Sequence, residues 1–259
     1  MNDNPESQLA DSPSYKAFLD SPEPSFKHTT YFAAYDALLG QYRNKPITFV
    51  EIGVLNGGSL FMWRKFFGDS ARIIGIDLNP AAKKWEAHGF EIFIGSQEDP
   101  TFWNGFCEVV DEIDVVLDDG GHTYLQQIIT TETLLDRIKD KGMLIVEDTH
   151  TSYMSGFGDP KIRFMNYIMQ VIHRINSRFS GFTPAQADRR VWSVEIFESI
   201  AAFKVDRKSS NLESKPLWNQ EPESGDLEAD YRYERAPVAE AEKKVVAQLI
   251  SNAFQIHPS

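Results

Sequence analysis

The sequence has almost no cysteine, no long apolar run and no cluster of basic residues. Its one cysteine among 259 residues, Cys107, has no partner for an internal disulfide, as is typical of proteins in a reducing compartment. No stretch approaches the roughly 20 apolar residues that span a membrane. The first residues, MNDNPESQLADSP, are acidic and polar and lack the basic and apolar regions of a signal peptide. We therefore expect a cytoplasmic protein with no membrane span.

Positive charge is also scarce. The chain has 26 Lys and Arg residues against 38 Asp and Glu residues, which gives a formal net charge of −12. Because binding to a phosphate backbone depends on clustered positive charge, this balance argues against a nucleic-acid partner. A length of 259 residues is enough for a hydrophobic core without disulfides. The composition therefore indicates an acidic globular protein.

Composition divides the chain into three parts. Residues 1–28 are rich in proline, serine and acidic residues, which predicts a flexible N-terminal arm. Residues 29–207 show regular apolar patterns and form the predicted domain. Residues 208–259 begin as a polar linker, and an apolar stripe predicts a last helix over residues 238–254. That helix either packs on its own domain or mediates a contact between copies of the chain, and the sequence favours neither.

Short apolar runs alternate with helical patterns in the predicted domain. The runs predict five strands, at residues 47–53, 72–77, 91–95, 113–118 and 142–146. Strands that alternate with helices favour a parallel sheet with helices on both faces. Two further strands, at 191–197 and 200–205, are joined by only two or three residues, which forces an antiparallel pair. The predicted fold is α/β, a Rossmann-like seven-stranded sheet of five parallel strands followed by an antiparallel hairpin.

A glycine-rich turn follows the first predicted strand. The segment EIGVLNGGS places Glu51 and Gly53 at the end of the strand, and Asn56 and Ser59 before the next helix, which is a nucleotide-binding arrangement. Gly53 permits a tight turn and the close approach of a ligand to the backbone. The turn is not the G-x-G-x-x-G dinucleotide fingerprint, and the acidic Glu51 argues against a pyrophosphate. We expect these four residues to form part of a cofactor site.

Polar residues also follow the next two predicted strands. Asp77 ends the second strand about 24 residues after Gly53, close to the roughly 20-residue offset at which an acid binds ribose hydroxyls. Ser96 and Gln97 follow the third strand, and each can hydrogen-bond the edge of a base. Alternatively, Asp77 caps the next turn, and Ser96 and Gln97 form an ordinary polar turn. We favour the ribose contact for Asp77, whereas the two roles of Ser96 and Gln97 are nearly balanced.

Acidic residues gather where the fourth and fifth predicted strands end. Asp118 and Asp119 close the fourth strand, with His122 three residues further on, and Glu147 and Asp148 close the fifth. The carboxyl ends of neighbouring parallel strands meet at one edge, so the four carboxylates would repel one another unless a cation were bound. Carboxylate oxygens suit Mg²⁺. Helix capping by these acids is the alternative, but two acidic pairs beside a histidine favour a metal site.

Taken in order, these motifs resemble those of one family. The segments EIGVxxGGSL, GSQxD, DDGGH and EDTHTSY, within residues 27–206, are similar to the Mg²⁺-dependent sugar O-methyltransferases of macrolide and related antibiotic pathways. These are class I S-adenosylmethionine-dependent enzymes, and their superfamily includes rhamnosyl O-methyltransferases and cephalosporin hydroxylase-like proteins. The resemblance implies three metal ligands, Asp119, Glu147 and Asp148. It implies cofactor contacts at Glu51, Gly53, Asn56, Ser59, Asp77, Ser96, Gln97 and Asp119. Met154 stands where an aromatic residue is common, which puts the acceptor pocket in doubt.

The resemblance also implies a reaction. A methyl group would pass from S-adenosylmethionine to a hydroxyl of a sugar, in a natural-product glycoside or a surface glycan, with Mg²⁺ as the metal cofactor. His122 would act as the general base that removes the hydroxyl proton. Its alternative role is that of a residue at a helix start that only positions Asp119.

For five residues around these motifs, the sequence does not settle the role. His150 is a weaker candidate for a contact with the metal ligands or the substrate, and Tyr153 for part of a lid over the acceptor. Lys27, His28 and Tyr31 either cover the cofactor or begin a solvated helix.

Three other functions remain open. A catechol or small-phenol O-methyltransferase also uses Mg²⁺ on this fold. A hydroxylase-like enzyme would hold non-haem iron through Asp119, His122 and His150, although the pair Glu147 and Asp148 favours Mg²⁺. A protein that binds the cofactor only as a sensor would have no need of the acidic cluster.

Overall fold

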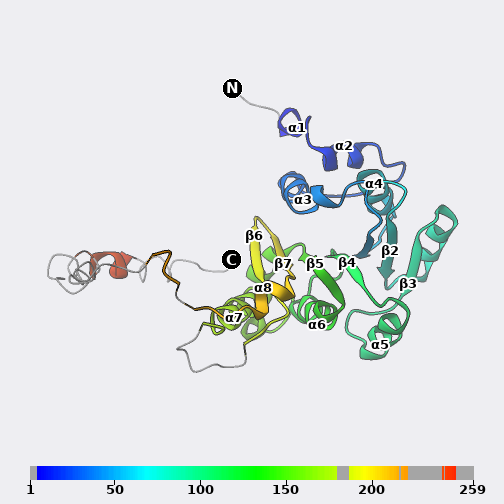
Figure 1. The fold of residues 1–259 in the computed structure, drawn as a ribbon. Helices are drawn as coiled ribbons and strands as arrows, with labels where there is room; N and C mark the ends of the chain where they lie inside the picture. The colour runs from blue at the N-terminus through cyan, green and yellow to red at the C-terminus, as the bar shows by residue number, and fades with distance from the viewer. Residues whose placement is uncertain (1–4, 180–186, 216, 221–240, 242, 249–259) are drawn as a thin grey trace. The chain divides into compact units, whose positions relative to one another are not determined.

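The computed structural model describes residues 5–179, 187–215, 217–220, 241 and 243–248. The chain divides into two compact units, Met1–Glu213 and Ser214–Ser259. The helix that the sequence predicts over residues 238–254 lies largely outside the described residues. All elements named below belong to the first unit, whose ribbon is labelled in Figure 1.

A mixed sheet of seven strands forms the centre of the first unit (Figure 1), in the spatial order β3-β2-β1-β4-β5-β7-β6. The strands are β1 (Thr48–Ile52), β2 (Arg72–Asp77), β3 (Glu91–Ile94), β4 (Ile113–Asp118), β5 (Ile138–Val146), β6 (Ser193–Phe197) and β7 (Ile200–Lys204). The first five run parallel, and β7 is antiparallel to both β5 and β6. The predicted Rossmann-like α/β sheet, with five parallel strands and a C-terminal hairpin, is confirmed.

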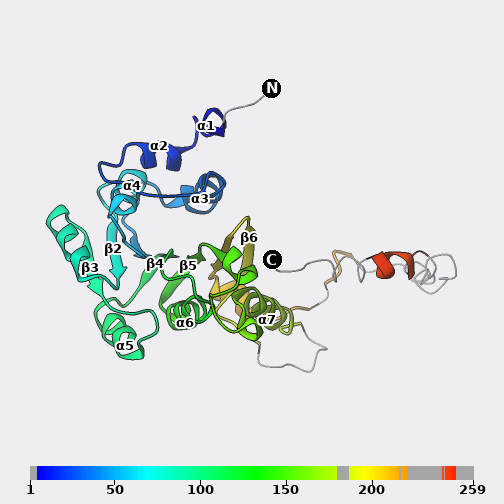
Figure 2. The same cartoon turned by 180° about the vertical axis from the view of Figure 1, so that it is seen from behind.

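Helices cover both faces of the sheet (Figure 2). One face carries α3 (Tyr31–Leu39) and α4 (Gly58–Phe67), and the other carries α5 (Pro100–Val109), α6 (Tyr124–Leu134) and α7 (Phe164–Asn176). The shorter elements are α8 (Arg207–Asn211), η1 (Gly40–Tyr42), η2 (Pro80–His88), η3 (Leu135–Arg137), η4 (Thr149–Tyr153) and η5 (Pro160–Ile162), where η marks a 3₁₀-helix. Among the described residues, no helix combines the length and the apolar character that crossing a membrane requires.

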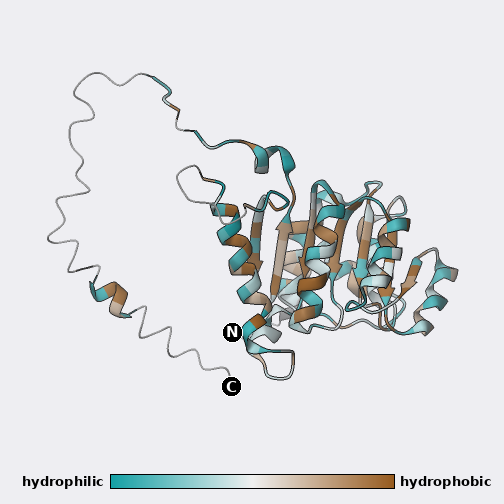
Figure 3. Cartoon of the chain, turned by 90° about the horizontal axis from the view of Figure 1, so that it is seen from below, coloured by the Kyte–Doolittle hydropathy of each residue, from teal (hydrophilic) through white to brown (hydrophobic). Residues whose placement is uncertain are grey.

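The core follows from the alternation of side chains along each strand. Val115 and Leu117 of β4 pack with the helices of one face, whereas Val116 between them packs with those of the other. Figure 3 shows apolar residues concentrated on the strands. Because the central strands are apolar on both faces, their polar residues gather at the strand ends, where the site lies.

The N-terminal segment contains two short helices that its composition did not predict. Residues 5–28 contain α1 (Pro5–Gln8) and α2 (Pro13–Leu19). Ser12 caps α2 by accepting a backbone N–H of the first turn, and Pro13 occupies the first helical position, where its missing N–H costs nothing. The prolines that suggested disorder therefore include one that starts a helix.

Candidate active site

A cavity of about 500 Å³ opens at the carboxyl ends of β1, β2, β3 and β4. Open α/β sheets bind their ligands at this edge. Six of the predicted cofactor residues line the cavity: Gly53, Asn56, Asp77, Ser96, Gln97 and Asp119. Two lie elsewhere, because Glu51 is buried and Ser59 borders a smaller hollow. The structure therefore gathers most of the predicted cofactor residues around one cavity.

Gly53 marks the point where the glycine-rich turn lies against the loop after β4. Its φ of +91° is in the left-handed region, and an added Cβ would lie 2.0 Å from the carbonyl oxygen of Asp119. Its N–H donates to the carbonyl of Ile76 at 2.8 Å. Glycine alone fits a position that is both left-handed and this close to another backbone.

Glu51 supports the turn from inside the domain. Its buried carboxylate accepts hydrogen bonds from Ser59 Oγ at 2.7 Å and from Trp63 Nε1 at 2.9 Å. Burial raises the pKa of Glu51 to about 7, although the Lys27 ammonium group and these two hydrogen bonds oppose the rise. The hydrogen bond between Glu51 and Ser59 therefore holds the first turn of α4 against the end of β1.

The polar residues after β2 and β3 already have partners within the protein. Asp77 Oδ2 accepts the backbone N–H groups of Val54 and Leu55, both at 2.9 Å, and so ties β2 to the turn after β1. Ser96 Oγ accepts a backbone N–H two residues further on, and the buried amide of Gln97 is hydrogen-bonded to the loop after β4. Asp77 Oδ1 also accepts the N–H of Asn79 at 2.7 Å, in the next turn, so these are the capping and turn roles considered above. Contacts from Asp77, Ser96 and Gln97 to a cofactor stay predictions.

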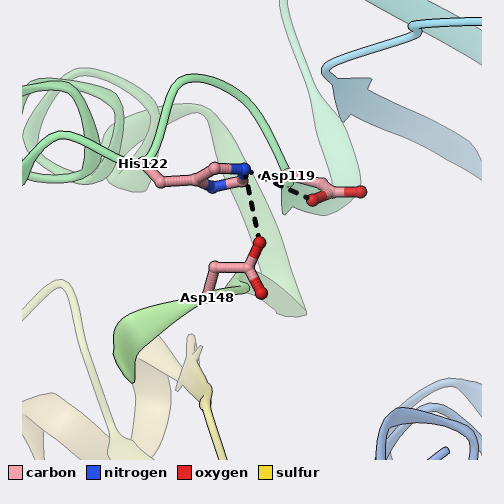
Figure 4. A group of neighbouring side chains, drawn as sticks. All are labelled: Asp119, His122 and Asp148. Carbon is pink, nitrogen blue, oxygen red and sulfur yellow. Dashed lines mark ion pairs between the residues drawn. The ribbon is translucent and has the colours of Figure 1, made fainter. Parts of the chain in front are cut away.

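Asp119, His122 and Asp148 face one another on the wall of the same cavity (Figure 4). One carboxylate oxygen from each aspartate and a ring nitrogen of the histidine all lie within 4.8 Å of one another. His122 Nε2 is 3.3 Å from Asp148 Oδ2 and 4.0 Å from Asp119 Oδ1. Carboxylate oxygens are donors that divalent cations take in proteins, and the imidazole lies beside them. The residues present therefore fit a metal ion.

The backbone turns these side chains toward one another. His122 and Asp148 have φ values of 57° and 56°, in the left-handed region that non-glycine residues rarely adopt. His122 lies next to Thr123, which begins α6 in a capping box with Gln126 and so fixes the backbone on that side. Strain of this kind persists where the surroundings determine it, and it is common at active sites.

Glu147 points away from the cluster, into the domain. Its Oε1 accepts the hydroxyl of Tyr35 at 2.5 Å, and its Oε2 lies 2.9 Å from Lys27 Nζ. The side chain is 1 % exposed. Burial raises the pKa of Glu147 to about 8, while the positive charge of Lys27 opposes the rise. Two of the three predicted metal ligands thus face His122, and Glu147 faces Lys27.

Lys27 and Tyr35 are the partners of Glu147, and sequence patterns did not reveal either contact. Lys27 Nζ also lies 2.6 Å from Asp119 Oδ2, across 92 residues of sequence, and its side chain is 2 % exposed. Burial lowers the pKa of Lys27, but the carboxylates of Asp119 and Glu147 raise it well above its usual value. Tyr35 is part of the apolar stripe of α3, so only its hydroxyl could have suggested a polar partner.

A second cavity, of about 510 Å³, lies between the N-terminal segment, η4 and the turn that joins β6 to β7. Four of the five side chains whose roles were open line it together with apolar ones: His28, Tyr31, His150, Tyr153, Met165 and Ile196. The Tyr31 hydroxyl donates to Asp148, and its oxygen lies 3.0 Å from Ser199 Oγ. Asp148 therefore lines the first cavity and is bonded to a wall of the second.

Comparisons with known proteins agree with this architecture. A family model described as a methyltransferase domain matches residues 50–149. The 8-demethyl-8-alpha-L-rhamnosyl tetracenomycin-C 2'-O-methyltransferase of Streptomyces olivaceus is 28% identical over 187 residues, which cover 66% of this chain and 49% of that protein. The mycinamicin VI 2''-O-methyltransferase of Micromonospora griseorubida is 26% identical over 217 residues, 75% of this chain and 52% of that protein. The chain spans about half the length of these curated relatives.

A solved structure has the same fold. The MycE methyltransferase from the mycinamycin biosynthetic pathway, in complex with Mg, SAH and mycinamycin VI, matches 80% of this chain and 55% of its own, with a TM-score of 0.67 and 25% sequence identity. The chain is therefore similar to methyltransferases, in sequence over residues 50–149 and in its fold. In this chain the glycine-rich turn after β1 and the acidic ends of β4 and β5 lie on one edge of the sheet.

Proposed function

We propose that this protein is a class I S-adenosylmethionine-dependent methyltransferase, which moves a methyl group from S-adenosylmethionine to a hydroxyl of a sugar carried by a small molecule or a glycan. The observation that carries the proposal is the cluster of Asp119, His122 and Asp148, with a cavity at the strand ends on one side and a second cavity beside it. The names of the curated relatives, which specify O-methylation of a rhamnosyl compound and of mycinamicin VI, support a sugar hydroxyl as the acceptor.

The cavity at the strand ends is the proposed cofactor site. Asp77 lies where an acid binds ribose hydroxyls in nucleotide-binding folds, and Ser96 and Gln97 line the part after β3 that would hold the base. Gly53 and Asn56 line the turn. The second cavity is the proposed acceptor site, because Tyr31 connects its wall to the acidic cluster and because apolar side chains suit the remainder of a glycoside.

A divalent cation, Mg²⁺, is the proposed second cofactor, and Asp119, Glu147 and Asp148 are the residues that would hold it. Asp119 and Asp148 already direct oxygens toward a common point, and Glu147 would have to leave its present partners to join them. Hard carboxylate oxygens are the donors that Mg²⁺ prefers. When bound, the ion supplies Lewis acidity that makes a nearby hydroxyl more acidic.

His122 is the proposed general base. The acceptor oxygen attacks the methyl carbon in line, the bond from that carbon to sulfur breaks, and its electron pair stays on sulfur. The hydroxyl proton passes to His122 Nε2, which faces the two carboxylates at 3.3 Å and 4.0 Å. Help of this kind is typically worth ~10²–10⁴-fold in rate.

A methyl-transfer assay with the purified full chain tests this function. Labelled S-adenosylmethionine is offered with a rhamnosylated natural product, its aglycone and a catechol. We expect label in the glycoside and none in the aglycone. Transfer to the catechol instead would support a phenol O-methyltransferase, and binding of the cofactor without any transfer would support a sensor. The hydroxylase alternative has less support, because His150 Nδ1 lies 2.5 Å from Ser199 Oγ beside the second cavity.

A further inference from the structure

The ammonium group of Lys27 lies between the acidic side chains that follow β4 and β5, where a bound cation would also lie. Its Nζ contacts Asp119 Oδ2 at 2.6 Å and Glu147 Oε2 at 2.9 Å, and its side chain is almost fully buried. Asp119 and Glu147 are two of the three proposed metal ligands. A lysine from the N-terminal segment therefore already neutralises part of the charge that a metal ion would neutralise.

Glu147 has no oxygen that is without a partner. Oε1 accepts the Tyr35 hydroxyl at 2.5 Å, and Oε2 holds Lys27. A divalent ion at Oε2 would lie directly beside an ammonium group in a buried site, where like charges repel strongly. In agreement with this, the metal-competent group among the described residues contains Asp119, His122 and Asp148 but lacks Glu147.

The segment around Lys27 reaches both cavities. Residues 20–30, between α2 and α3, contain neither helix nor strand. The segment is fixed upstream, where Ser21 Oγ donates to the carbonyl of Gly58 at 2.8 Å, and downstream, where Tyr31 bonds to Asp148. Because a lysine side chain has four rotatable bonds, its ammonium group can leave the carboxylates while the backbone stays fixed.

We propose that Lys27 is a built-in competitor for the divalent ion. Its ammonium group holds the carboxylates of Asp119 and Glu147 in place in the metal-free protein, and the ion binds Glu147 only by displacing it. The inference rests on the proposed metal site. Lys27 is then a positioning residue, which keeps the ligands together when the metal is absent and weakens the binding of the metal.

Binding of Mn²⁺ as a spectroscopic probe tests the competition. Lys27→Met removes the charge and keeps an unbranched aliphatic side chain. We expect the full-length variant to bind Mn²⁺ about tenfold tighter or more, in a titration followed by electron paramagnetic resonance, because a nearby like charge is gone. Lys65→Met, which changes a lysine that is 61 % exposed, should bind as the wild type does. A side chain with a purely structural role would weaken Mn²⁺ binding when removed, and equal or weaker binding by folded Lys27→Met overturns the proposal.

A measurement on the wild type makes the test independent of any variant. Acetylation of Lys27 by acetic anhydride, followed by mass spectrometry, should rise several-fold when Mn²⁺ is bound, while Lys65 stays unchanged. A labelling rate of Lys27 that bound Mn²⁺ does not alter rejects the displacement. If the wild type and Lys27→Met both fail to bind Mn²⁺, the proposed metal site itself is wrong. Equal affinity in both proteins rejects only the role of Lys27.

Discussion

Backbone strain collects at the residues of the candidate site. His122, Asp148 and Ser199 all have left-handed φ values, and each such residue costs on the order of 1–3 kcal/mol. His122 and Asp148 face each other across 3.3 Å, and Ser199 Oγ lies 3.0 Å from the Tyr31 hydroxyl on the wall of the second cavity. The surrounding structure must therefore determine this geometry, as is expected where side chains have to meet a substrate.

Replacing His122 by glutamine should lower kcat by ~10²–10⁴-fold, because glutamine cannot take the acceptor proton. Binding of S-adenosylmethionine should stay within a few-fold, since the cofactor cavity is otherwise intact. Steady-state kinetics and calorimetry measure the two effects. His173→Gln is the matched control, because His173 is exposed on α7. Unchanged turnover by His122→Gln would remove His122 as the base.

Gly53→Ala should abolish cofactor binding, because its Cβ would force the backbone of Asp119 to move. Gly156 offers a matched control: it has the same φ of +91°, and nothing lies within 4 Å of an added Cβ. Gly156→Ala should cost only the left-handed conformation, about 1–2 kcal/mol. Urea unfolding should show a larger loss for Gly53→Ala. Equal losses in the two variants would mean that the contact with Asp119 is unimportant.

From the sequence it is easier to predict which residues lie at the site than to predict which way their side chains point. Asp119 and His122 could be placed because the carboxyl ends of parallel strands share an edge. Glu147 is buried against Lys27, whereas the adjacent Asp148 faces the cavity. The φ of Asp148 is left-handed, and a sequence pattern does not show such a turn of the backbone. The partner Lys27 could not be found, because no spacing rule links residues 92 positions apart.

At the scale of elements, strands were easier to predict than their surroundings. Apolar runs located all seven strands, and the short joint between β6 and β7 required the hairpin. The helical pattern between the second and third predicted strands forms a 3₁₀-helix, η2. The strand β5 begins at Ile138 rather than residue 142, through an irregular pairing with β4. The N-terminal helices were missed because proline and serine favour both a helix start and disorder, and only packing decides between them.

The N-terminal cap of α6 lies next to a residue of the site, because Thr123 directly follows His122. Thr123→Ala removes the capping bond to Gln126 and should cost about 1 kcal/mol of stability. Because His122 precedes this cap, kcat should fall as well. Asp99→Ala removes the equivalent bond at the start of α5 and should cost about as much while leaving kcat within a few-fold. Urea unfolding and steady-state kinetics separate the effects, and a Thr123→Ala variant with wild-type kcat would show that the cap does not position His122.

At the scale of the whole molecule, the net charge of −12 includes carboxyl groups that are buried rather than solvated. Glu51, Asp118 and Glu147 all lie inside, at the ends of neighbouring central strands. Burial raises the pKa of each of them. The stability of the domain should therefore respond to pH in the neutral range.

Glu51 provides the test of that response. Burial raises its pKa from 4.5 to about 7, so between these values the folded protein keeps a proton that the unfolded chain has lost. The free energy of unfolding then falls as pH rises, by about 1 kcal/mol from this group between pH 6 and pH 8. Urea unfolding of the metal-free protein at both pH values measures it. Glu51→Gln should lose that part of the pH dependence, and a slope equal to that of the wild type would contradict the assignment.

Methyl transfer before and after removal of divalent metal tests the central claim most directly. The purified chain is assayed with S-adenosylmethionine and a rhamnosylated acceptor, then with excess EDTA, and then with Mg²⁺ restored. The proposed function predicts that transfer is lost with EDTA and recovered with Mg²⁺, and that Asp148→Asn recovers little. Full activity of Asp148→Asn in excess EDTA would contradict it.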